Sequence, residues 1–148
     1  MVKRNLDQLY RQVILEHYRK PRNSGELETQ THKIEMNNPT CGDQIFLNLY
    51  VQDGIIKDAK FTGSGCSISI ASASMMTETI KGLTIEKALL VSRDFSEMMQ
   101  GHTHEHLSEE NEELEVLAGV SQFPARIKCA TLAWKAMEKA VAVDKTTK

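Results

Sequence analysis

The sequence of 148 residues predicts an α+β fold in a single domain. An apolar stripe at helical spacing lies near the N-terminus, a β-hairpin pattern follows, and the second half is mostly helical. Hydrophobic residues make up 41% and charged residues 26% of the chain, as in an ordinary soluble globular protein with one core. The formal net charge of −2 gives no reason to expect nucleic acid or an anionic membrane as a partner.

The first helix is expected over residues 5 to 19. Asn5 is the candidate N-cap, and Gln8 stands three positions later as its capping-box partner. Pro21 and the cluster Asn23-Ser24-Gly25 end the helix. The residues predicted to form its buried stripe are Leu6, Leu9, Tyr10, Val13, Ile14, His17 and Tyr18.

A β-hairpin is expected after a polar stretch over residues 26 to 43. Residues 44 to 51 and 55 to 62 are rich in strand-forming side chains, and Asp53-Gly54 between them is a hairpin turn signal. Antiparallel pairing brings the outer ends of a hairpin together. We therefore expect Cys41 and Asp43, just before the first strand, to become neighbours of Cys66, just after the second.

The rest of the chain predicts three more helices. They cover residues 67 to 81, residues 84 to 99, and a final segment that begins at Pro124, a residue favoured in the first turn of a helix. Residues 101 to 115 between the last two are polar and acidic. The core candidates of the final helix are Ile127, Leu132, Trp134, Met137 and Val141.

Three cysteines lie far apart, each in a setting that suits a thiolate. Cys41 precedes a glycine and Asp43, Cys66 directly precedes a predicted helix, and Cys129 follows the basic Lys128. A helix N-terminus and nearby positive charge both favour the ionised thiol. An odd number of cysteines cannot pair completely, and no export signal is apparent, so we expect the reducing cytoplasm.

These cysteines could pack as small buried side chains, bind a metal, or carry sulfur. Packing is the common use of an isolated cysteine, and it explains less well why all three stand at element ends. Three thiolates and the Asp43 carboxylate would complete a tetrahedral zinc site, although no CxxC pair supports that reading by spacing.

Other candidate residues favour structural roles. His102, His104 and His106 alternate along an acidic stretch, which indicates an exposed loop more than a metal site. His17 lies on the apolar stripe of the first helix and is expected to be packed or hydrogen-bonded. The pairs Met75-Met76 and Met98-Met99 are expected to fill the core.

Taken together, these motifs resemble iron–sulfur cluster assembly proteins of the IscU/NifU N-terminal family. The resemblance rests on Thr40-Cys41-Gly42-Asp43, on Gly63-Ser64-Gly65-Cys66-Ser67-Ile68-Ser69, and on the third cysteine in the final helix. It extends over nearly the whole chain, from His17-Tyr18 through the hairpin to that helix. It implies one compact domain over residues 1–148, with a small antiparallel sheet and helices packed on one of its faces.

The sequence differs from the scaffold members of the family in three traits, and in these traits it resembles the SufU branch. Lys128 stands where scaffolds carry a histidine, and a protonated lysine cannot serve as a metal ligand. Residues 123 to 128 lack the LPPVK-like segment of scaffolds served by a dedicated Hsp70 pair. An insertion is expected near residues 101–122. Members of the SufU branch bind zinc and accept sulfur from a cysteine desulfurase.

The resemblance implies a zinc-dependent sulfurtransferase that accepts persulfide sulfur from a SufS-type cysteine desulfurase. Downstream Suf cluster-assembly proteins are further expected partners. One alternative is a scaffold that assembles a [2Fe–2S] cluster on the same side chains, and another is a purely structural zinc domain. The implied zinc ligands are Cys41, Asp43, Cys66 and Cys129. Among them we expect Cys41 to accept the sulfur, because it precedes Gly42 on a loop and could leave the metal most easily.

Overall fold

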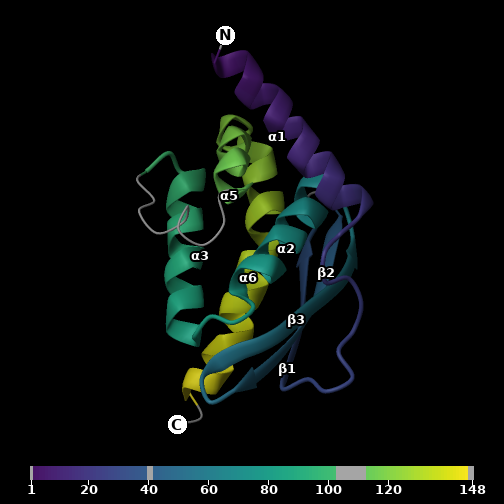
Figure 1. Ribbon diagram of the computed structural model, residues 1–148, viewed down its shortest axis with the longest axis vertical. Coiled ribbons are helices and arrows are strands. Elements are labelled where there is room, and N and C mark those ends of the chain that lie inside the picture. Colours follow the sequence, from purple (N-terminus) through teal and green to yellow (C-terminus); the bar gives the residue numbers. More distant parts are fainter. Residues whose placement is uncertain (1, 40–41, 103–112, 147–148) are drawn as a thin grey trace.

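The computed structural model describes residues 2–39, 42–102 and 113–146 of the chain. Helix α1 comes first and a three-stranded sheet follows, after which the chain is helical to its end (Figure 1). The elements are α1 (Val2–Arg19), β1 (His32–Asn38), β2 (Asp43–Gln52), β3 (Ile55–Ser64), α2 (Ser67–Ile80), α3 (Ile85–Met99), α5 (Glu113–Val116), the 3-10 helix η1 (Leu117–Gln122) and α6 (Pro124–Thr146).

The sheet is antiparallel, in the order β1-β2-β3. The predicted hairpin is confirmed as β2 and β3. Asp53 and Gly54 connect the two strands with φ angles of 56° and 75°, the positive values that a tight hairpin turn requires. The inward side chains Ile45, Leu47 and Leu49 of β2 have no exposed surface and form the sheet's contribution to the core.

Helices cover the inner face of the sheet, as predicted (Figure 1). Helix α6 contacts β1 and β2, α2 contacts β3, and α2 and α6 contact each other. Helix α1 packs on α2, and α3 packs on α6. The rings of Phe95 on α3 and Trp134 on α6 stack with their centroids 4.8 Å apart, so the outer helix is joined to the core by aromatic contact. The result is the expected α+β domain.

Two expectations for the first helix are wrong. The helix begins at Val2, so Asn5 lies inside it and does not cap it. Tyr18 is 45% exposed, whereas Val13, Ile14 and His17 are buried as expected. The buried stripe therefore ends at His17, one residue earlier than the apolar spacing indicates.

Two structured segments lie where the sequence indicated only polar chain. Strand β1 occupies part of residues 26 to 43, and its side chains alternate, with Ile34 and Met36 turned toward the core. Helices α5 and η1 follow the acidic stretch and bury three side chains, Leu114, Leu117 and Val120. Both segments are short, and their burial depends on contacts with distant elements. The insertion near residues 101–122 stays a prediction.

The predicted helices over 67 to 81, over 84 to 99 and from Pro124 correspond to α2, α3 and α6.

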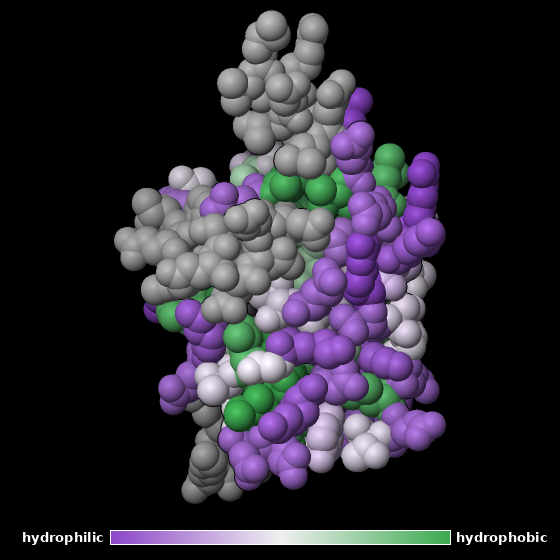
Figure 2. Space-filling model, viewed as in Figure 1, coloured by the Kyte–Doolittle hydropathy of each residue, from purple (hydrophilic) through white to green (hydrophobic). Residues whose placement is uncertain are grey.

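The view in Figure 2 is mostly hydrophilic, with hydrophobic side chains in small separate patches. Within the described ranges, no helix combines the length and apolar character that crossing a membrane would need.

Candidate metal centre

Asp43 lies at the start of β2, opposite Asn38, the last residue of β1. The hydrophobic alternation of β2 turns Asp43 to the same face as the core, where its side chain is 1% exposed. Its Oδ1 accepts the backbone N–H of Cys66 at 2.9 Å. Its Oδ2 is buried and has no hydrogen-bond partner among the described residues. This oxygen is therefore free to coordinate a cation, which would offset the cost of burying the carboxylate.

Cys66 is the N-cap residue of α2, and only Gly65 separates it from the end of β3. The hairpin therefore brings Asp43 and Cys66 together, as predicted, while Cys41 lies outside the described residues. Gly65 makes this approach possible: its φ angle is +150°, and a Cβ there would lie 2.3 Å from Asp43 Oδ1. Only glycine fits here without displacing the Asp43 carboxylate.

Cys129 lies in the second turn of α6 and has no exposed surface. Asn38 Nδ2 donates a hydrogen bond to its sulfur at 3.8 Å. Helix α6 is tied to α2 through the buried Ser72, which donates from Oγ to the Ala130 carbonyl at 2.5 Å and accepts from Trp134 Nε1 at 3.2 Å. These bonds hold the helix of Cys129 against the helix that begins after Cys66.

The three side chains form one cluster. One carboxylate oxygen of Asp43 and the sulfurs of Cys66 and Cys129 all lie within 4.8 Å of one another. Cys66 is half-buried, and both described cysteines are thiols. Two sulfurs and one carboxylate oxygen, with one oxygen otherwise unsatisfied, fit a tetrahedral zinc ion that takes a fourth ligand.

Lys128, which precedes Cys129, is exposed at the surface. An ammonium group has no lone pair to offer a metal, so Lys128 supplies no ligand.

The remaining candidates from the sequence are the histidines of the acidic stretch and the two methionine pairs. His102 is 61% exposed and pairs with Glu97 at 2.6 Å, while His104 and His106 lie outside the described residues. Met75, Met76, Met98 and Met99 are buried, which confirms core filling.

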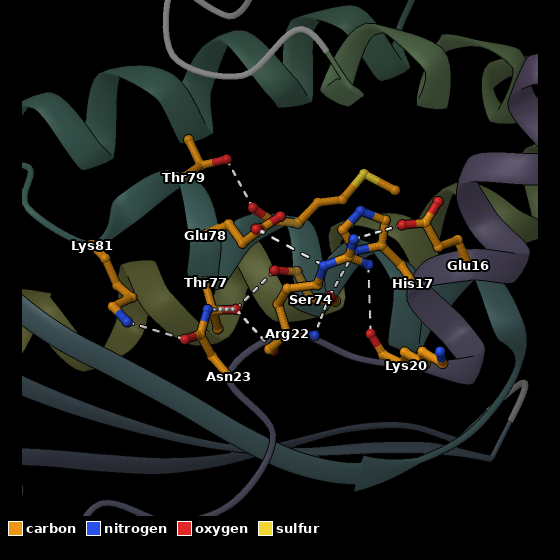
Figure 3. Close-up of polar contacts among 11 residues, drawn as sticks. Glu16, His17, Lys20, Arg22, Asn23, Ser74, Thr77, Glu78, Thr79 and Lys81 are labelled. Atoms are coloured by element: carbon orange, nitrogen blue, oxygen red, sulfur yellow. Dashed lines mark hydrogen bonds and ion pairs between the residues drawn. The ribbon is translucent and has the colours of Figure 1, made fainter.

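His17 is fully buried, and its Nδ1 lies 2.7 Å from Ser74 Oγ, which confirms the predicted packed histidine (Figure 3). The same hydroxyl accepts the backbone N–H of Arg22 at 2.8 Å. The Arg22 guanidinium donates to Glu16 at 2.6 Å and, by this bond and its charge, lowers the pKa of Glu16. These contacts fasten the end of α1 to α2.

Asn38 is the residue near the site that sequence reasoning missed. The alternation Ile34, Met36, Asn38 was its available signal, because it points the three side chains to one face of a strand. That signal is weak, since a polar residue completes the pattern.

A three-stranded antiparallel sheet is covered on one face by helices, and a carboxylate and two thiols lie together beyond its hairpin. These features define a small α+β domain with a candidate metal centre. The chain belongs to the NifU-like N terminal domain family, whose pattern matches residues 9–146. This confirms the resemblance to the IscU/NifU N-terminal family.

Relatives that span most of the chain include a sulfurtransferase and a scaffold protein. It is 58% identical over 140 residues to "Zinc-dependent sulfurtransferase SufU" of Bacillus subtilis (strain 168), covering 95% of this chain and 94% of that protein. It is 44% identical over 136 residues to "Iron-sulfur cluster assembly scaffold protein IscU" of Streptococcus pyogenes serotype M1, covering 92% of this chain and 84% of that protein.

The fold is also similar to a crystal structure of FiSufU from Fervidobacterium islandicum AW-1. The TM-score is 0.83 at 30% identity, and the match covers 90% of this chain and 97% of that chain.

Proposed function

We propose that this protein is a zinc-dependent sulfurtransferase of iron–sulfur cluster biogenesis that accepts persulfide sulfur from a SufS-type cysteine desulfurase. The observation that carries the proposal is the cluster of Asp43, Cys66 and Cys129, whose ligand atoms lie within 4.8 Å of one another. Cys41 is the fourth proposed ligand because it stands two residues before Asp43 in the sequence. The 58% identity to the zinc-dependent sulfurtransferase of Bacillus subtilis supports the same assignment.

Zinc would keep the thiols deprotonated and therefore nucleophilic without redox chemistry of its own. The chain supplies the environment: Asp43 Oδ1 is fixed by the Cys66 amide, and Oδ2 is left for the ion. A carboxylate is a harder ligand than a thiolate, so Asp43 is the weakest member of the set.

Cys41 is the proposed sulfur acceptor. Cys129 is fully buried in α6 and Cys66 is half-buried at the cap of α2, so burial limits the access of a partner protein to both. Cys41 precedes Gly42 in the sequence, and we infer that it leaves the metal most easily. The Cys41 thiolate would attack the outer sulfur of the desulfurase persulfide, forming a new S–S bond as the original S–S bond breaks. The desulfurase cysteine leaves as a thiolate, and Cys41 keeps the persulfide, with no net oxidation.

Assembly of a [2Fe–2S] cluster on the same side chains is the second candidate function. The 44% identity to the scaffold protein of Streptococcus pyogenes supports it. The exposed Lys128 argues against it, because this position carries a ligand histidine in the scaffolds that the sequence resembles.

Metal analysis of the purified protein, combined with desulfurase turnover measured with and without it, tests the proposal. We expect one zinc per chain and a faster desulfurase, with the stimulation abolished in Cys41→Ala. Ser24→Ala, an exposed hydroxyl-to-methyl change, is the control and should stimulate normally. Full stimulation by Cys41→Ala would exclude this acceptor role.

Two further results would point to the other functions. Zinc binding without any effect on desulfurase kinetics would indicate a structural zinc domain. Anaerobic reconstitution of a cluster that passes to an apoprotein would favour the scaffold.

A further inference from the structure

Asn38 is a buried amide that contacts a proposed metal ligand. It ends β1 and is 6% exposed, and its Nδ2 donates to the Cys129 sulfur at 3.8 Å across 91 residues of sequence. Buried amide donors are normally hydrogen-bonded, so the position of this group and the position of the sulfur constrain each other.

The backbone of Asn38 serves the same site. Its carbonyl accepts the N–H of Gly42 at 2.8 Å, and its strand partner across the sheet is Asp43. Asn38 thus contacts the Cys129 sulfur with its side chain, and its backbone carbonyl holds Gly42 near the end of β1.

The hydrogen bond distinguishes Cys129 from Cys66. In the described parts of the chain, no hydrogen bond is made to the sulfur of Cys66, which is half-buried, whereas the Cys129 sulfur is fully buried and accepts from Asn38. An N–H donor to a ligand thiolate orients it and withdraws electron density from it. Such a sulfur is a poorer nucleophile and a more constant ligand.

We propose that Asn38 is a positioning residue, which holds the Cys129 sulfur toward the bound ion and keeps it there while another cysteine takes sulfur. The inference rests on the proposed zinc site, and it adds that Cys129 is the ligand that stays bound to the metal.

The test replaces Asn38 by leucine, which keeps the branched shape of the side chain and removes the donor. The matched control is Asn37→Leu, the same change at the neighbouring exposed position, whose side chain lies on the other face of the strand. Zinc affinity is measured by competition with a chromophoric chelator, and the sulfur-to-metal charge-transfer bands are recorded with cobalt in place of zinc.

We expect Asn38→Leu to bind zinc about 10- to 100-fold more weakly and to shift the cobalt charge-transfer bands, because the lost donor belongs to the outer shell of the site. Asn37→Leu should match the natural protein in both. Alkylation of the zinc-loaded protein, mapped by peptide mass, should reach Cys129 last in the natural protein and earlier in Asn38→Leu.

If the metal-free leucine variant does not melt cooperatively, Asn38→Ser, whose hydroxyl is too short to replace the amide contact, takes its place. Unchanged affinity and an unchanged cobalt spectrum in a folded Asn38 variant would overturn the inference alone. Absence of zinc binding by the natural protein would instead overturn the proposed function.

Discussion

The Asp43 carboxylate accepts the backbone N–H of Cys66 at 2.9 Å, so one proposed ligand directly holds the backbone of another. The bond joins the start of β2 to the cap of α2. It occupies Oδ1 and leaves the buried Oδ2 without a hydrogen-bond partner in the described part of the chain. The Asp43 and Cys66 positions are therefore fixed without an ion. The buried, unpaired Oδ2 lowers the stability of the metal-free protein, and a bound ion would offset that cost.

Replacing Gly65 by alanine should abolish metal binding. The new Cβ would meet Asp43 Oδ1 at 2.3 Å, and the φ of +150° is unfavourable for any side chain. The matched control is Gly82→Ala, at φ +89° with open space around the Cβ, where strain of about 1–3 kcal/mol is the only cost. Thermal melts and zinc content should show both variants destabilised and only Gly65→Ala without zinc. Full zinc occupancy in Gly65→Ala would contradict this geometry.

Asp43→Asn should stabilise the metal-free protein and weaken the metal-bound one. The amide oxygen can still accept from Cys66, while the buried negative charge at Oδ2 disappears. We expect the free energy of unfolding in chelator to rise by about 1–3 kcal/mol.

Added zinc should then stabilise Asp43→Asn less than the natural protein, because stabilisation by a ligand follows its affinity. Urea unfolding with chelator and with zinc measures both effects. A metal-free variant less stable than the natural protein would show that the Asp43 charge is already compensated.

Ser72→Ala should loosen the connection between α2 and α6. The hydroxyl makes two buried hydrogen bonds, to the Ala130 carbonyl and from Trp134 Nε1, and its loss leaves the indole donor unsatisfied. We expect a loss of about 1–3 kcal/mol and weaker zinc binding, because Ala130 adjoins Cys129.

The control for Ser72→Ala is Ser92→Ala. Ser92 is also buried and donates to Glu138 at 2.6 Å, which joins α3 to α6 instead of α2 to α6. This variant should lose stability without changing zinc affinity. Equal effects of the two variants on zinc affinity would mean that the α2–α6 contact does not position the site.

Glu16→Gln should change the dependence of stability on pH in acid. The hydrogen bond and charge of Arg22 lower the pKa of Glu16 below its ordinary value of 4.5. A lowered pKa in the folded state adds stability at pH values above the ordinary one, and that stability is lost as the pH falls through the folded value. Urea midpoints should show the natural protein above Glu16→Gln at neutral pH and equal to it in strong acid.

Glu28→Gln, at an exposed position after α1, is the control for Glu16→Gln. It should follow the natural protein at every pH. A constant difference between Glu16→Gln and the natural protein would assign the effect to packing instead of charge.

Local patterns predicted much of this fold. The turn at Asp53-Gly54, the start of the last helix at Pro124 and the helix predicted from residue 84 depend on residues close in sequence. In the structure, Thr84 caps that helix by accepting the Lys87 N–H. Strand β1 was missed because its inward side chains are held by pairing with β2, with Ile34 opposite Leu47 and Met36 opposite Ile45. Its short alternating pattern carries too little local information to define a strand.

By itself, the sequence determined the order of α1, the hairpin of β2 and β3, α2, α3 and α6, the settings of Cys41, Cys66 and Cys129, and the family to which the chain belongs. It also predicted that the hairpin would bring Asp43 and Cys66 together, because antiparallel pairing joins strand ends. Only the tertiary structure decided that Asp43 fixes the Cys66 amide and that Asn38 meets the sulfur of Cys129. Each of those contacts joins the end of a strand to a helix that is distant in sequence. Their positions depend on how the helices pack on the sheet, because burial of the shared core fixes that packing.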